Sequence, residues 1–219
     1  MKALFFFFCA GLAALLAAGG PARAAPKPPE TPVPSVDHVY WMVDCMTVAK
    51  SREIEKALST VPAPGGIEIH WFKAALGCLR QDLPIPAAYF YKRGAVAERF
   101  LYRDFESIGG APRRAPVRVF APVGADYLAK DPKAAPALVM LDAASCLVRI
   151  HPAQAYDFFS LDRGSAEEAA RMNEMAPALS RCLTRGDPIK LTAPIFRAFL
   201  AEAAYRVAAG QPEVFEGKF

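Results

Sequence analysis

The cysteines that follow the N-terminal region are arranged as two similar pairs. Cys45 and Cys78 lie 33 residues apart, and Cys146 and Cys182 lie 36 residues apart. The second pair follows the first at offsets of 101 and 104 residues. Such agreement indicates a tandem duplication, and a duplicated unit restricts what each half of the chain can fold into.

A Tyr-Arg dipeptide follows each cysteine pair. Tyr102-Arg103 and Tyr205-Arg206 are separated by an offset of 103 residues, close to the offset of the cysteines. We interpret each Tyr as closing the base of a helical unit through its ring and hydroxyl group, and each Arg as covering apolar surface with its aliphatic stem. A pair of equivalent binding sites is the functional alternative.

The repeat favours one disulfide pairing among the three that four cysteines allow. Bonds Cys45–Cys78 and Cys146–Cys182 give each copy the same crosslink, whereas Cys45–Cys146 with Cys78–Cys182 requires equivalent surfaces to pack face to face. We therefore expect pairing within each copy. Each bond should restrict the unfolded chain by about 3.5 to 4 kcal/mol on the entropy model. The sequence has neither the closely spaced cysteine pairs of a zinc site nor a C-x-x-C redox motif, so all four cysteines are predicted to be structural.

The N-terminus has the features of a cleavable export signal. A single charge at Lys2 precedes an apolar run over residues 3–18, and Ala22-Arg23-Ala24 follows. We expect cleavage after Ala24 and a periplasmic or secreted location, where disulfides persist. A membrane anchor is the alternative, but the run is shorter than the roughly 20 apolar residues that a spanning helix needs.

The remainder of the chain divides by composition. Five prolines within residues 25–34 favour an extended, disordered arm. Clustered Gly and Pro residues interrupt the chain again after residue 104, and Val117–Phe120 alternates like a short strand. The expected organisation is a signal peptide (1–24), an arm (25–34), helical repeat 1 (35–104), a linker (105–130), helical repeat 2 (131–210) and a C-terminal tail (211–219).

Helix signals dominate both predicted repeats. Ser165 and Glu168 have the spacing of a capping box. Thr192 is a predicted N-cap, and Pro152 is expected at the first position of another helix. The chain is therefore predicted to be all-α, with two disulfide-stapled units of about four helices each joined by an irregular linker. The helices are expected at 37–49, 51–60, 66–80 and 85–104 in the first unit, and at 136–149, 152–161, 165–184 and 193–208 in the second.

Charge and motifs argue against several functional classes. The chain has 26 Lys and Arg against 22 Asp and Glu, and removal of the signal leaves 24 against 22, so no nucleic-acid partner is expected. Only His38, His70 and His151 could serve as histidine bases, and His151 precedes Pro152 where a capping role is expected. No catalytic motif is found, and we predict no catalytic residue, metal or cofactor.

Two clusters remain as candidate binding residues. Aromatic residues and histidines of the first repeat could line a ligand pocket, although core packing is the favoured interpretation. Basic residues near the end of the first repeat could contact an anionic surface, although solvated helix faces have the same pattern. The aromatic candidates are His38, Trp41, His70, Trp71, Tyr89 and Tyr91, and the basic candidates are Arg99, Arg103, Arg113 and Arg114, within a wider cluster that includes Lys92, Arg93 and Arg118.

These observations predict an exported, non-enzymatic helical protein. It is expected to act through contact with an envelope protein or with an anionic surface of the cell envelope. The alternative is a periplasmic protein that binds a small ligand or lipid through the aromatic first repeat. Any specific function is expected where the two repeats differ.

Overall fold

The computed structural model describes most of the chain that follows the predicted arm, in several ranges. The predicted signal peptide and arm lie outside the described residues. So does most of the helix expected at 66–80. The described ranges are residues 36–49, 51–63, 78, 89–183, 191–211 and 213–216.

Helices account for all the regular secondary structure of the described residues, which confirms the predicted all-α class. The residues Val117–Phe120 are extended but form no strand, so their alternation was misleading. Isolated bridges join Phe105 to Pro112 and Val123 to Phe215. In chain order the elements are α1 (Val36–Ala49), α2 (Ser51–Ser59), α4 (Tyr89–Asp104), α5 (Ala125–Lys130), the 3-10 helix η1 (Pro132–Ala134), α6 (Ala135–Ile150), α7 (Pro152–Phe158), α8 (Ala166–Cys182) and α9 (Ala193–Ala208).

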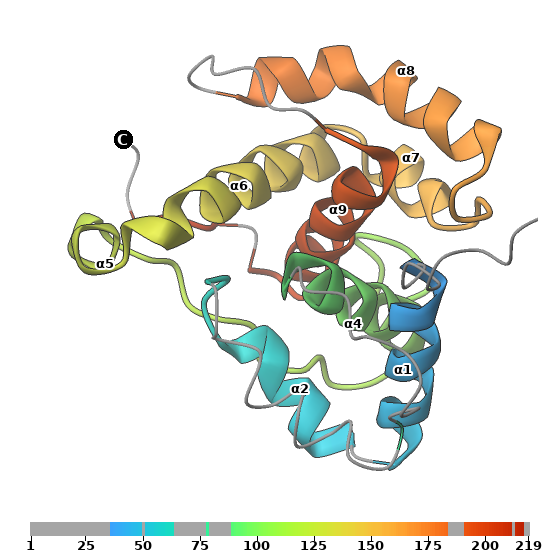
Figure 1. Ribbon diagram of the computed structural model, residues 1–219, viewed down its shortest axis with the longest axis horizontal. Coiled ribbons are helices and arrows are strands. Elements are labelled where there is room, and N and C mark those ends of the chain that lie inside the picture. Colours follow the sequence, from blue (N-terminus) through green and yellow to red (C-terminus); the bar gives the residue numbers. More distant parts are fainter. Residues whose placement is uncertain are drawn as a thin grey trace, which may run out of the picture. The chain divides into compact units, whose positions relative to one another are not determined.

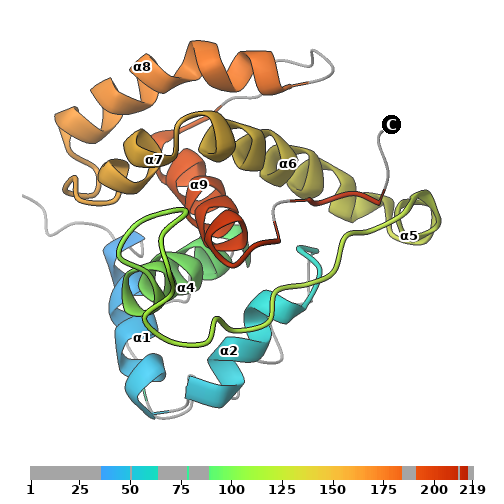
Figure 2. The same cartoon turned by 180° about the vertical axis from the view of Figure 1, so that it is seen from behind.

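Helices α4 and α9 pack against each other at the centre of the unit Val33–Phe219 (Figures 1 and 2). Helices α1 and α2 contact α4, and α6, α7 and α8 contact α9. Gly94 lies at the contact between the central helices. A Cβ atom at this position would lie 2.4 Å from the Cα of Ala198, so the close approach depends on a residue without a side chain. The apolar residues of both halves form one core.

Local signals explain where several helices begin and end. The Ser165 side chain accepts a hydrogen bond from the Glu168 backbone N–H, as the capping box predicts. Helix α7 begins at Pro152 but ends three residues before the predicted position, because Phe159, Ser160 and Leu161 close tight turns to carbonyls three residues back. The predicted linker contains α5, a short helix that we did not expect.

Both disulfides have the predicted pairing. The Cα atoms of Cys45 and Cys78 are 5.9 Å apart, and those of Cys146 and Cys182 are 5.8 Å apart. The second bond joins α6 to the last residue of α8. Each half of the chain is therefore crosslinked within itself.

Among the described residues, no single helix has the length and apolar character to cross a membrane. A bent pair formed by Pro132–Ile150 and Pro152–Phe158 meets the criteria of length and composition only when its two parts are taken together.

Candidate functional site

Buried ion pairs connect the two central helices. Arg197 on α9 donates from Nε to Oε2 of Glu98 on α4 at 2.9 Å, and from Nη2 to Oε1 at 2.8 Å. Both side chains are almost completely buried. Burial alone lowers the pKa of Arg197, but its hydrogen bonds to Glu98 and Glu168 raise the pKa above the ordinary value. The guanidinium therefore stays charged inside the protein.

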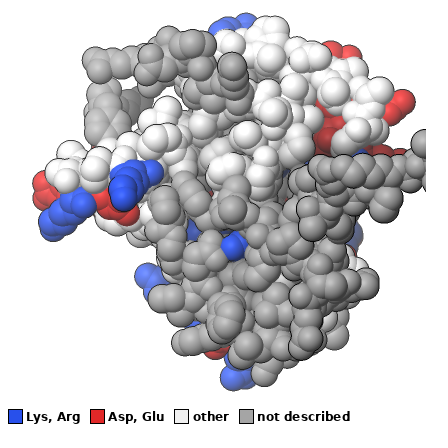
Figure 3. Space-filling model, viewed as in Figure 1, with Lys and Arg blue, Asp and Glu red and all other residues white. Residues whose placement is uncertain are grey.

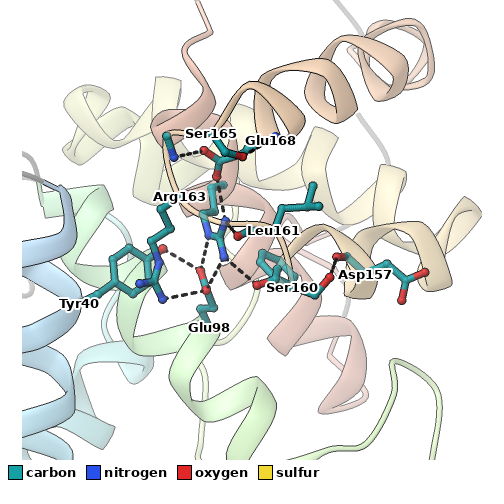
Figure 4. A network of polar contacts seen from close by, with 11 residues as sticks. Tyr40, Glu98, Asp157, Ser160, Leu161, Arg163, Ser165 and Glu168 are labelled. Atoms are coloured by element: carbon teal, nitrogen blue, oxygen red, sulfur yellow. Dashed lines mark hydrogen bonds and ion pairs between the residues drawn. The ribbon is translucent and has the colours of Figure 1, made fainter.

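The same carboxylate binds two further side chains. The Tyr40 hydroxyl donates to Glu98 Oε2 at 2.7 Å, and Arg163 Nη2 lies 3.3 Å from Oε1. Arg163 also stacks over the Tyr40 ring, with its Cζ atom 3.5 Å from the ring centroid. Figure 4 shows these side chains converging on Glu98. Burial, followed by the charge of Glu98, raises the pKa of Tyr40 well above its ordinary value. Helix α1 is thereby tied to α4 and to the loop before α8.

The capping box of α8 joins this network. Glu168 Oε1 accepts a hydrogen bond from Arg197 Nη1 at 2.9 Å, while its Oε2 accepts one from the backbone N–H of Gly164 at 2.7 Å. One side chain therefore caps a helix and pairs with a buried charge. The arrangement has a structural role, because both carboxylate oxygens of Glu98 and of Glu168 accept hydrogen bonds from other groups of the protein (Figure 4).

A second buried ion pair joins the same helices, and here the arginine lies on α4 and the glutamate on α9. Arg93 on α4 donates from Nε to Oε2 of Glu202 on α9 at 2.9 Å, and its Nη2 also contacts Glu202 Oε1. Arg93 and Arg197 are 104 residues apart, as are Glu98 and Glu202. The shared spacing Arg-x-x-x-x-Glu was therefore a readable sequence signal that we missed. Burial of Arg93 also corrects its assignment to an exposed basic cluster, and Lys92 is buried as well.

Glu202 and Arg206 have the i, i+4 spacing that predicts an ion pair on the surface of a helix, but this prediction is wrong because both side chains are buried. Arg206 donates to the Phe120 carbonyl at 3.0 Å and stacks over the Phe120 ring, 4.1 Å from its centroid. It also donates to the Glu213 carbonyl. Burial lowers the pKa of Arg206 to about 10. The Arg206 guanidinium therefore lies against an aromatic ring in the interior.

A second polar cluster surrounds Asp104 at the end of α4. Its side chain is fully buried and receives two hydrogen bonds from Arg103, at 2.6 and 2.9 Å. The Tyr205 hydroxyl donates to Asp104 at 2.9 Å and accepts from the Val117 backbone N–H at 2.8 Å. Burial, followed by the hydrogen bond to Asp104, raises the pKa of Tyr205 above its ordinary value. Tyr205 thus links the extended segment after α4 to the end of that helix.

An open groove of about 530 Å³ lies between α2 and this extended segment. Figure 2 shows the segment, coloured yellow-green, running alongside α2. Five of the lining side chains are cationic, and Glu55 is the single carboxylate in the described lining. The lining residues are Arg52, Glu55, Lys56, Ser59, Arg103, Arg114, Ala115, Pro116, Val117 and Arg118, which we call the basic groove.

The predicted basic residues divide between this groove and other surfaces. Arg103 and Arg114 line the basic groove. Arg99 instead pairs with Asp44 at 3.2 Å, and Arg113 pairs with Glu106 at 3.2 Å. Sequence reasoning missed the contribution of α2, although the residues 52, 55, 56 and 59 have the spacing of one helical face.

The structure describes only some of the side chains that were predicted to line an aromatic pocket. His70 and Trp71 lie outside the described residues, and nothing is described of the side chains of His38 and Tyr89. Trp41 is 46 % exposed on α1. Tyr91 contacts the Phe90 ring, with centroids 4.5 Å apart, and lies on α4. Of the six candidates, only Trp41 and Tyr91 therefore have described side chains.

Figure 3 shows where charged atoms of the described residues lie on one face of the protein. Uncharged atoms dominate the upper part of this face, whereas the Lys and Arg atoms drawn in blue lie mainly at its left and lower margins.

Within the described part of the chain, no group of three or more His, Cys, Asp or Glu residues could hold a metal ion. His151 occupies the N-cap of α7, but its side chain makes no capping hydrogen bond.

Fold and site together define an all-α, disulfide-crosslinked protein with a basic groove beside a helical core. Comparison with protein-family models, curated proteins and solved structures finds no match to this chain.

Proposed function

We propose that this is an exported, non-enzymatic protein that binds an anionic partner through the basic groove. The main support for this proposal is the excess of cationic side chains in one concave site. The described lining has five cationic side chains and a single carboxylate. Concave surfaces of one charge sign concentrate the field and attract ligands of opposite charge. Export is supported by the signal-like N-terminus and by two intramolecular disulfides, which persist in oxidising compartments.

We also propose that the chain arose by tandem duplication of a crosslinked helical unit. The reciprocal Arg–Glu pairs support this origin, because their members share an offset of 104 residues. The offset between Cys78 and Cys182 is also 104 residues. The groove supports a division of roles, in which the shared residues build the core and the first unit together with the following linker carries the binding surface.

Binding to poly-L-glutamate at low and high ionic strength tests the proposed function. The variant Arg52→Gln/Arg118→Gln removes two groove cations that pair with no carboxylate in the described chain. We expect its affinity to fall by about tenfold, since each exposed charge pair contributes up to about 1 kcal/mol. High salt should weaken binding by the parent protein.

The matched control is Lys130→Gln/Lys133→Gln. It changes net charge by the same amount at α5 and η1, which lie outside the groove lining. The proposal predicts that this control binds poly-L-glutamate within about twofold of the parent protein. Equal losses in both double variants, or no salt-sensitive binding by the parent protein, would overturn it.

A further inference from the structure

The basic groove has two walls of different character. Helix α2 contributes polar and charged side chains, including Arg52 and Lys56. The opposite wall is extended backbone in which the uncharged run Ala115-Pro116-Val117 lies between Arg114 and Arg118. A complementary ligand therefore carries negative groups on both sides of an uncharged portion.

The extended wall is held in place before any ligand binds. Val117 is tethered to Tyr205 at 2.8 Å, and the Phe120 N–H donates to the Leu58 carbonyl of α2 at 2.9 Å. Arg206 also holds the Phe120 carbonyl at 3.0 Å. Three contacts thus fix the wall to α2 and α9. A preformed wall reduces the ordering cost that a ligand must overcome.

The groove cations differ in how far they are already neutralised. Arg103 is bound on two sides, by Asp104 and by Glu55 at 3.1 Å. Arg114 is 59 % exposed and lies 3.6 Å from Asp104, while Arg52 and Arg118 pair with no carboxylate in the described residues. The cations open to a ligand therefore lie on both walls, and the guanidinium group matches the geometry of a carboxylate.

The shape of the basic groove favours a polypeptide over a membrane surface as its partner. A volume of about 530 Å³ lies within the range of about 300 to 1,000 Å³ typical of ligand-binding sites. A flat bilayer surface cannot enter a concave groove to reach Val117 at its wall. An extended chain can enter, and its alternate side chains can meet cations and the uncharged wall in turn.

We infer that the basic groove binds an extended acidic segment of a partner protein, in which carboxylates flank a small apolar residue. The inference rests on the proposed function and specifies its partner. Arg52 of one wall and Arg114 and Arg118 of the other bind the carboxylates. Pro116 and Val117 contact the apolar residue between them.

Peptide binding tests this assignment directly. The probe is a short peptide in which glutamates alternate with alanine and valine, compared with the same peptide carrying glutamine in place of glutamate. We expect saturable binding of the acidic peptide only, and about tenfold weaker binding to Arg52→Gln/Arg118→Gln. The control Lys130→Gln/Lys133→Gln should bind the peptide like the parent protein.

Vesicles containing phosphatidylglycerol separate this inference from the broader proposal. One outcome would overturn the polypeptide assignment but retain the proposal that the basic groove binds an anionic partner. In that outcome the parent protein binds the vesicles but not the acidic peptide, and Arg52→Gln/Arg118→Gln no longer binds the vesicles. Equal binding of the glutamate and glutamine peptides would also overturn the assignment. If neither probe binds differently to the groove variant and the control, both the assignment and the proposed function fail.

Discussion

Charged residues hold the interior of this protein together. Glu98 binds Arg197, Tyr40 and Arg163, and all of these contacts lie within or at the edge of the core. Removing one member of a buried ion pair leaves its partner desolvated without compensation. The cost of such a change therefore exceeds the energy of one surface pair.

The variant Glu98→Gln measures this effect. We expect the free energy of unfolding to fall by about 3 to 5 kcal/mol, because the Arg197 guanidinium loses one of its two buried counter-charges and keeps only Glu168. The control Glu174→Gln removes an exposed pair with Arg171 on α8 and should cost less than about 1 kcal/mol. Denaturant unfolding monitored by circular dichroism gives both values. Similar losses in the two variants would contradict a stabilising role for the buried pair.

Helix α8 shows how local signals and tertiary contacts meet in one element. Its first turn is closed by Ser165 and Glu168, and its last residue, Cys182, is bonded to Cys146. The side chain of Glu168 also reaches Arg197 on α9. Both ends of the helix are therefore fixed, one by hydrogen bonds and the other by a covalent bond.

Two N-cap residues provide a matched comparison. Ser165→Ala removes the side-chain acceptor that binds the Glu168 N–H, and we expect a loss of about 1 kcal/mol in the free energy of unfolding. Thr192 occupies the N-cap of α9 without a side-chain capping bond, so Thr192→Ala should cost less than about 0.5 kcal/mol. Thermal and denaturant unfolding can rank the two variants. A larger loss for Thr192→Ala would show that capping does not govern the start of α8.

The packing of α4 against α9 unites the two halves of the chain. Gly94 allows the backbones to approach closely, and the pairs Arg93–Glu202 and Arg197–Glu98 lie on the same two helices. Apolar residues from both halves join one core around these helices. The contact between α4 and α9 is therefore the most extensive helix–helix contact in the described part of the chain.

Replacing Gly94 with alanine tests the importance of that contact. In an isolated helix this change is favourable by about 1 kcal/mol, but here the new Cβ would lie 2.4 Å from the Ala198 backbone. We expect a net loss of about 2 kcal/mol or more in the free energy of unfolding, because the helices must separate.

A control at Gly124 isolates the steric effect. A Cβ at this position would meet only the end of the flexible Glu216 side chain, at 3.1 Å. Gly124→Ala should therefore change the free energy of unfolding by less than about 1 kcal/mol. Stabilisation of the protein by Gly94→Ala would show that the two helices do not need the close approach.

The helices of this protein were predictable where their signals are local. Ser165 and Pro152 mark helix starts through hydrogen-bonding and backbone constraints that act within a few residues. The groove was only partly predictable. Arg103 and Arg114 were identified from their charge, but their meeting with Arg52 depends on α2 lying beside a segment about 60 residues later in the chain.

The amino-acid sequence by itself indicated the helical class, most helix limits and the disulfide pairing, because capping groups and proline geometry act over short distances and the two cysteine pairs have similar spacings. Only the tertiary structure decided which charged residues are buried. Arg93 and Glu202 resemble solvent-exposed helix residues until α4 and α9 approach, and then each becomes the other's buried partner. The energy of a charge depends on its surroundings in space, and those surroundings are created by packing.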